Sequence, residues 1–260
     1  MLDKLLLNSG SDIPVPSMGL EIRQPSLMEI AKFGEQNLYK VLNLINYSKE
    51  DYLEHLDNQE KEGKISPEAV ESVKTDLMFM TDFQLILEAA KEEDSLKDFF
   101  ISLFYLLIPA SSKVVIEEDR FVSISFREGQ GKNLILSEDM FSEFRTIVLE
   151  MFLMSGEDKN GFNPVDERAA EIAKKLEERH RRLAIEKGEH NKETSTIATN
   201  ASILSSMANI SLREIYQYTL PQLYQQLDRT TKYSAYENQI TLGAFGGLKD
   251  VEMVDFRESI

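Results

Sequence analysis

The 260-residue sequence has no cysteine and no tryptophan. Without cysteine the chain has no disulfide, no thiolate ligand for a metal and no cysteine nucleophile. Long apolar runs are also absent, since the most apolar stretch, Phe99 to Ile108, has about half of the roughly 20 residues that span a bilayer. Met1 to Asn8 lacks the small-residue cleavage signal of a secreted protein. We therefore expect neither a membrane-spanning nor a secreted chain.

Positive charge is scarce as well. Lys and Arg total 29 against 45 Asp and Glu, which gives a formal net charge of -16. This balance argues against a nucleic-acid partner, because such binding draws most of its affinity from basic side chains that neutralise phosphates. Residues 1–153 carry 28 acidic and 15 basic side chains, whereas residues 154–260 carry 17 and 14. The acidic half either keeps the chain soluble or matches a basic partner.

Helical signals dominate residues 1–153. Apolar runs of helical spacing begin at four serines, Ser26, Ser48, Ser66 and Ser137. Ser48 and Ser66 are the predicted N-terminal caps, because the hydroxyl of such a serine accepts a hydrogen bond from a free N–H of the first turn. Gly34 interrupts the run that Ser26 begins, and helical spacing resumes from Leu38 to Ile45.

Three other stretches have the composition of strands. Between Lys113 and Arg127, β-branched and aromatic residues alternate around a turn-like acidic centre, which predicts a β-hairpin with a possible third strand at Asn133 to Leu136. Asp3 to Leu7 and Leu20 to Ile22 are short apolar segments flanked by Gly, Ser and Pro. They predict weak strands or extended arms.

The rest of the chain is divided by polar segments. Asn163 to Lys187 predicts a long charged connector helix, and Gly188 to Asn200 has the composition of a flexible linker. Two capping boxes follow, in which Glu214 and Gln222 stand three residues after Ser211 and Thr219. The predicted fold is therefore mainly α, with an acidic helical domain carrying a small β-hairpin (1–153), a connector (154–200) and a small C-terminal helical unit (201–260). We expect the C-terminal helices to pack separately or loosely.

Candidate catalytic and metal sites are weak. Glu177 and His180 have the spacing of di-metal bundle proteins, but no second such pair exists, and their surroundings are those of a solvated charged helix. The glycines of Gly243 to Gly247 lack the Lys-Ser/Thr of a phosphate loop and fit a helix end. The two short helices over Ser211 to Arg229 have too few basic residues for a DNA-binding pair. We expect no enzyme activity, no cofactor and no metal.

Two stretches resemble the tail assembly chaperones of long-tailed bacteriophages, especially those infecting Gram-positive hosts. The first runs from Ile22 to Tyr39 and includes Ile22-Arg23-Gln24-Pro25-Ser26-Leu27-Met28-Glu29-Ile30. The second runs from Leu204 to Gly247 and includes Ile215-Tyr216-Gln217-Tyr218-Thr219-Leu220-Pro221-Gln222-Leu223-Tyr224. The layout of an acidic helical domain, a charged connector and a C-terminal unit is similar to that of the lambda-type proteins. The hairpin after Lys113 departs from that pattern.

The resemblance implies a function without catalysis. A chaperone of this kind binds the tape measure protein, keeps it soluble and recruits tail tube subunits in the host bacterial cytoplasm, and it is absent from the mature virion. Homo-oligomers are possible, and neither nucleic acid nor membrane is an implied partner. The alternatives are a structural tail completion or connector protein that stays in the virion, and an acidic protein that interacts with a host factor.

An apolar stripe near the start of the last helix is the predicted partner surface. Helical spacing places on it Tyr216, Tyr218, Leu220, Leu223, Tyr224 and Leu227. A unit of some 45 residues has little room to bury the whole stripe, and tyrosine is enriched at interfaces. The alternative is that the stripe packs within the unit, against Ile203, Leu204, Met207 and Ile210.

Overall fold

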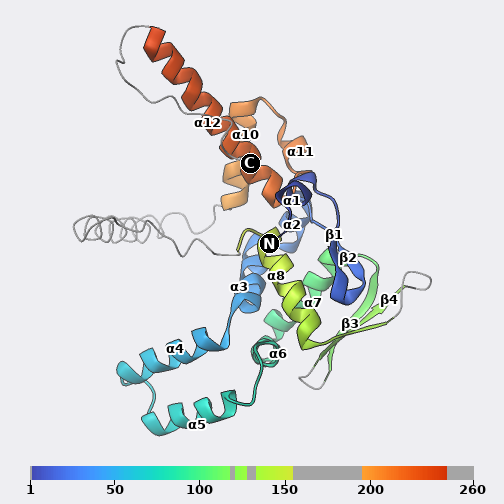
Figure 1. The fold of residues 1–260 in the computed structure, drawn as a ribbon, viewed down its shortest axis with the longest axis vertical. Coiled ribbons are helices and arrows are strands. Elements are labelled where there is room, and N and C mark those ends of the chain that lie inside the picture. Colours follow the sequence, from blue (N-terminus) through green and yellow to red (C-terminus); the bar gives the residue numbers. More distant parts are fainter. Residues whose placement is uncertain (1, 118–120, 128–132, 155–194, 245–260) are drawn as a thin grey trace.

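The computed structural model describes residues 2–117, 121–127, 133–154 and 195–244 (Figure 1), and the described chain is mostly helical. The body comprises α1 (Lys4–Ser9), β1 (Ile13–Val15), η1 (Pro16–Met18), β2 (Leu20–Ile22), α2 (Leu27–Phe33), α3 (Glu35–Asn46), α6 (Asp82–Glu92), α7 (Asp94–Leu107), β3 (Ser111–Glu117), β4 (Phe121–Phe126), β5 (Leu134–Leu136) and α8 (Glu138–Met151). Two helices, α4 (Lys49–Lys61) and α5 (Pro67–Leu77), form an arm. The C-terminal elements are α10 (Thr196–Ala208), α11 (Leu212–Ile215) and α12 (Leu220–Ala244). The predicted connector helix from Asn163 to Lys187 lies outside the described residues.

Phenylalanines from three helices form the centre of the body. Phe104 of α7 stacks on Phe144 of α8 with ring centroids 5.1 Å apart, and Phe83 of α6 stacks on Phe141 of α8 at 4.3 Å. All four side chains are almost completely buried. Aromatic pairs of this kind combine large apolar burial with a preferred offset geometry, so they fix the relative placement of α6, α7 and α8.

Two small antiparallel sheets flank the helices. The predicted hairpin is present as β3 and β4, with Ile116 opposite Val122, and β5 adds the third strand. One face is buried through Val114, Val122, Ile124 and Leu136. The strand predicted at Leu20–Ile22 is also present, and it pairs with β1 in a second hairpin that is not among the predicted elements.

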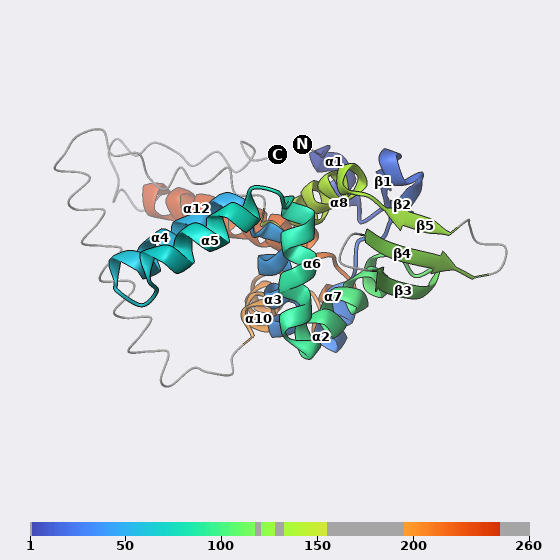
Figure 2. The same ribbon diagram turned by 90° about the horizontal axis from the view of Figure 1, so that it is seen from below.

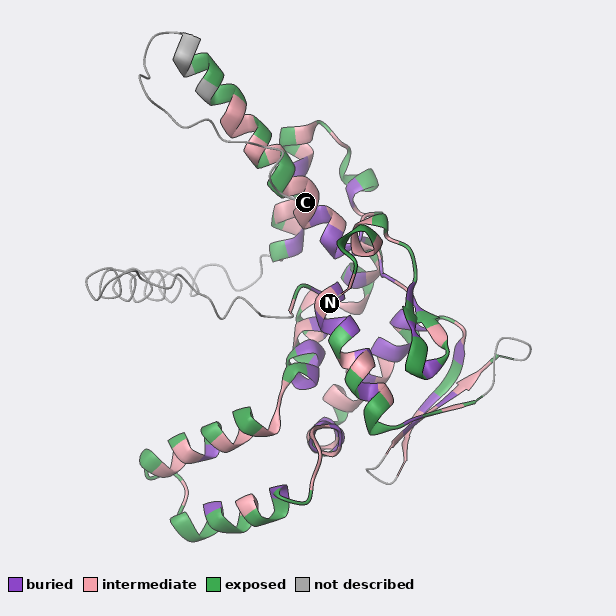
Figure 3. Cartoon of the chain, viewed as in Figure 1, coloured by how far each residue is buried: buried purple, intermediate pink, exposed green. Residues whose placement is uncertain are grey.

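The arm is an antiparallel helix pair with its own core (Figures 1 and 2). Leu56, Val70 and Leu77 form a small buried cluster with Leu85 of α6, separate from the main core. Ser48 and Ser66 cap the two arm helices as the sequence predicts, and Pro67 occupies the first turn of α5. The burial pattern in Figure 3 shows the arm mostly exposed, with buried residues confined to its inner stripe.

The C-terminal helices share the main core, so the prediction that they pack separately is wrong. Leu223 of α12 and Phe144 of α8 belong to one continuous cluster of buried residues, together with Ile197, Ala201, Leu204, Ile215 and Leu220. Helix α1 packs against α12, and the Gln222 side chain donates a 3.0 Å hydrogen bond to the carbonyl of Asn8. Contacts between the chain's two ends supply the burial that a small isolated unit lacks.

Two local predictions are also corrected. The segment Asp3 to Leu7, predicted as a strand or an extended arm, belongs to α1, because the Asp3 carboxylate caps the helix at the Leu5 N–H and Gly10 ends it with φ +71°. Leu6 and Leu7 pack against the main core. The predicted linker is helical in its last residues, since Ser195 caps α10, which begins at Thr196.

Candidate functional site

The start of α2 lies against the turn between α11 and α12. The Leu27 N–H donates to the carbonyl of Tyr218 at 2.8 Å, and the Met28 N–H donates to the carbonyl of Tyr216 at 3.0 Å. The first N–H groups of a helix have no partner within it. Here the turn between α11 and α12 supplies acceptors for two of them, and Ser26 supplies another for Glu29. The C-terminal segment thus completes the cap of an N-terminal helix.

A second set of contacts joins α10 and α12 to α3. The Glu35 carboxylate accepts a hydrogen bond from the Ser195 hydroxyl and another from the Ile197 N–H at 3.2 Å. The Tyr224 hydroxyl accepts a 3.1 Å bond from the Asn200 amide. Burial raises the pKa of Tyr39, and the neighbouring Tyr224 and Glu35 raise it further. Tyr39 and Tyr224 serve as packing and hydrogen-bonding groups at this junction.

The predicted partner stripe is largely used inside the chain. Leu220 and Leu223 are buried, at 4% and 0% exposure, and Tyr216, Tyr218, Tyr224 and Leu227 are half-buried against the main core. The two leucines are therefore corrected from partner residues to core residues, because α1, α10 and the body cover them. Among the residues proposed to cover the stripe, Leu204 is buried, whereas Ile203 and Met207 stay over 40% exposed.

A second stripe on α12 has two exposed residues and one partly buried residue. Tyr233, Tyr236 and Ile240 stand thirteen residues after Leu220, Leu223 and Leu227, so the two sets have the same spacing. At about 100° per residue, thirteen residues of helix change the direction of the side chains by about 140°. The second set therefore faces away from the side on which Leu220, Leu223 and Leu227 lie. Tyr233 and Ile240 are 49% and 46% exposed, on the half of α12 that extends beyond α10 (Figure 1). Among the described residues, this outer stripe is less covered than the Leu220 to Leu227 stripe.

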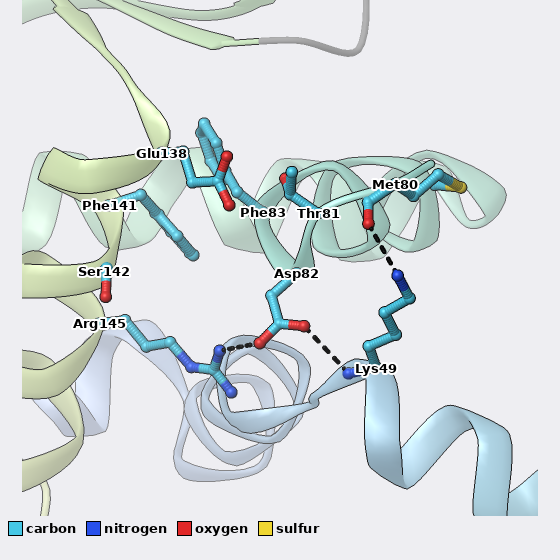
Figure 4. Close-up of a pocket in the computed structure, with 9 residues that line it drawn as sticks. All are labelled: Lys49, Met80, Thr81, Asp82, Phe83, Glu138, Phe141, Ser142 and Arg145. Carbon is cyan, nitrogen blue, oxygen red and sulfur yellow. Dashed lines mark hydrogen bonds and ion pairs between the residues drawn. The ribbon is translucent and has the colours of Figure 1, made fainter. Parts of the chain in front are cut away.

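A cavity of about 310 Å³ lies where the arm joins the body (Figure 4). Its charged residues are mostly engaged with one another. Arg145 of α8 donates to the Asp82 carboxylate at 3.0 Å and to the carbonyls of Asn46 and Tyr47 at the end of α3. Asp82 also accepts from the N–H of Lys49, whose ammonium group donates to the Met80 carbonyl at 3.2 Å. These bonds join α3, α4, α6 and α8, so the cavity marks a structural joint.

Two apolar side chains beside this joint point away from any core. Met78 and Phe79, between α5 and α6, are 74% and 84% exposed. Neither residue is among the candidate site residues that the sequence predicts. One feature of the sequence indicates exposed apolar side chains here, namely the uninterrupted apolar run from Leu77 to Met80 just before the cap residue Thr81. A helix of period 3.6 cannot bury four consecutive side chains on one face.

The described residues contain no cluster of three or more His, Asp or Glu that could hold a metal. The Glu177–His180 pair and most of the charged connector lie outside them. No described helix has both the length and the apolar character needed to cross a membrane. Comparison with protein-family models, curated proteins and solved structures finds no match.

Proposed function

We propose that this chain is a tail assembly chaperone of a long-tailed bacteriophage. In this function it binds the tape measure protein reversibly, keeps it soluble and recruits tail tube subunits in the bacterial cytoplasm, and it is released before the virion is complete. It acts by binding alone. The natural partners are other proteins, in keeping with an excess of acidic over basic side chains that disfavours nucleic acid.

One observation carries this proposal. The two stretches that resemble the chaperone family, separated by more than 160 residues, meet through backbone hydrogen bonds from Leu27 and Met28 to Tyr218 and Tyr216. Contact between the two stretches supports treating them as parts of one pattern. The outer stripe of α12 extends from this junction.

The outer stripe is the better candidate for recruiting tail tube subunits. Tyr233 and Ile240 are half-exposed, whereas the docked residues Leu220 and Leu223 are buried. Tyrosine and isoleucine supply large apolar area, and the tyrosine hydroxyl tolerates water. Replacing Tyr233 and Ile240 by Ala should abolish capture of the tail tube protein and leave the helical content unchanged. The matched control is Ile203→Ala with Met207→Ala on α10, where both side chains are similarly exposed.

Co-expression tests the central activity. The tape measure protein encoded beside this chain should be insoluble when expressed alone and soluble when both are expressed. The proposal fails if the tape measure protein stays in the pellet and the purified chain does not bind it. Mass spectrometry of purified particles tests the alternative of a virion component, because a chaperone should be absent from them and a completion or connector protein should be present.

A further inference from the structure

We propose that the base of the arm binds a basic amphipathic helix through Met78, Phe79 and the acidic side chains around them. The proposal rests on the proposed function only for the identity of the natural helix, which would then belong to the tape measure protein. The binding chemistry follows from the arm itself.

The apolar part of this surface is strongly exposed. Met78 and Phe79 expose more of their surface than any other large apolar side chains in the described chain except Leu5 of α1, which is 77% exposed. They are consecutive residues of the turn that follows α5, so both lie at the base of the arm. Methionine adapts its flexible thioether to irregular partners, and phenylalanine supplies a rigid ring. Such a pair suits the apolar face of a helix.

The charge around the patch is acidic. Residues 49–77, which form the arm, carry nine acidic and four basic side chains. Lys74 is paired with Asp57 at 2.8 Å, and Lys64 is paired with Glu62 at 2.6 Å. The bond from Lys49 to Met80 places the start of α4 beside the end of α5. Exposed Glu50, Glu54 and Asp76 therefore lie at the same end of the arm as the patch.

This charge selects among possible occupants. A second copy of the chain would bring another acidic arm, and the net charge of -16 makes that approach repulsive. A bilayer rich in anionic lipid is repelled for the same reason. The patch offers side chains on a helical arm, without the open strand edge that an extended peptide needs. A helix with lysines or arginines flanking its apolar face can contact Met78 and Phe79 through that face and pair its basic side chains with the acidic side chains of the arm.

The test uses the full-length chain and a fluorescein-labelled amphipathic peptide of eighteen residues built from leucine and lysine. Met78→Ser with Phe79→Ser should weaken peptide binding about tenfold, measured by fluorescence anisotropy, because loss of two anchors removes most of the apolar contact. The matched control is Leu5→Ser with Ile135→Ser, which removes two exposed apolar side chains from the body. It should change the dissociation constant less than twofold. Equal effects of the two pairs would overturn the proposal.

A second set of variants isolates the charge. Glu50→Gln, Glu54→Gln and Asp76→Asn together should weaken the peptide severalfold and flatten its salt dependence, because exposed charges are screened by salt. The control neutralises Asp12, Glu21 and Asp139, which are exposed on the body. Binding that is indifferent to the arm triplet would contradict the inference. Circular dichroism checks that each variant is folded. Solubilisation of the tape measure protein is a separate measurement, so failure there removes the proposed function without deciding peptide binding.

Discussion

Ser26 joins the cap of α2 to the C-terminal segment. Its hydroxyl and N–H both contact the Glu29 carboxylate, at 3.0 and 2.9 Å, and Glu29 also pairs with Arg23 at 2.8 Å. Ser26 itself forms a β-bridge with Thr219. One residue therefore ties a local helix cap to a contact between distant parts of the sequence.

We expect Ser26→Ala to lower the free energy of unfolding by about 1 kcal/mol, the usual loss when a helix cap is removed. It should also speed proteolysis after α10, because the cap and the docked turn share this site. Urea denaturation measures the first effect and limited proteolysis the second. Ser48→Ala removes the similar capping box of α4 in the arm. If that control speeds cleavage after α10 equally, the coupling between Ser26 and the C-terminal segment is disproved.

Glu214 gives a pH-dependent prediction. Hydrogen bonds from the side chain and then the backbone of Ser211 lower the pKa of Glu214, which is the acidic member of the α11 capping box. A carboxylate whose pKa is lowered in the folded state stabilises the fold above its unfolded pKa, and this contribution disappears as pH falls through the folded pKa. Glu214→Gln should therefore be less stable than the wild type near neutral pH. The two curves from thermal denaturation should converge as pH falls through the lowered pKa of Glu214, and parallel curves would contradict this assignment.

At the scale of elements, α12 has two halves with different roles. Leu223 is completely buried in the main core, whereas Tyr233 on the outer half is 49% exposed. We expect Leu223→Ala to lower the free energy of unfolding by about 3 kcal/mol, because it leaves a cavity in the core. Tyr233→Ala should change it by less than about 0.5 kcal/mol. Chemical denaturation of the two variants checks the division, and a similar loss from both would show that the outer half is also packed.

The sequence predicts what is set by local contacts. Ser26, Ser48 and Ser66 cap helices whose starts follow from the hydroxyl and the next few residues, and the Lys113 to Arg127 alternation predicts the hairpin. Docking of the C-terminal helices is different. An apolar stripe such as Leu220 to Leu227 has the same spacing whether it faces a partner or the chain's own body, so its occupant depends on tertiary contacts.

Tertiary contacts also decide the structure of α1 and the exposure of Phe79, and the sequence does not predict either. Asp3 to Leu7 is too short for a helical period to be distinguished from a strand, and contact with α12 decides in favour of the helix. Phe79 follows a helical stripe in the sequence, yet the chain turns away at that point and leaves the ring exposed. Caps and periods are thus readable from the sequence, whereas the faces that remain uncovered are known only once the elements are assembled.

At the scale of the whole molecule, the arm and the body have separate buried clusters joined at a narrow base. Leu85 of α6 packs into the arm cluster, and the ion pair between Arg145 and Asp82 lies beside it. Arg145 also binds the last carbonyls of α3, and Asp82 also binds the first N–H of α4. The pair therefore connects the end of α3 to the start of α4 at Tyr47 and Ser48, one of the two places where the arm joins the body.

We expect Arg145→Met to widen the range of arm orientations without unfolding either cluster, because methionine keeps the apolar stem and loses all three hydrogen bonds of the guanidinium. The absence of native cysteine makes the measurement direct, since spin labels attach only to introduced thiols. Labels at Asn58→Cys in the arm and Glu21→Cys in the body, both exposed positions, report the separation by pulsed electron spin resonance. The distance distribution should be narrow in the parent chain and broad in Arg145→Met.

Arg213→Met, which removes an exposed arginine from α11, is the control and should leave the distribution narrow. An unchanged width in Arg145→Met would show that packing around Leu85 alone fixes the arm.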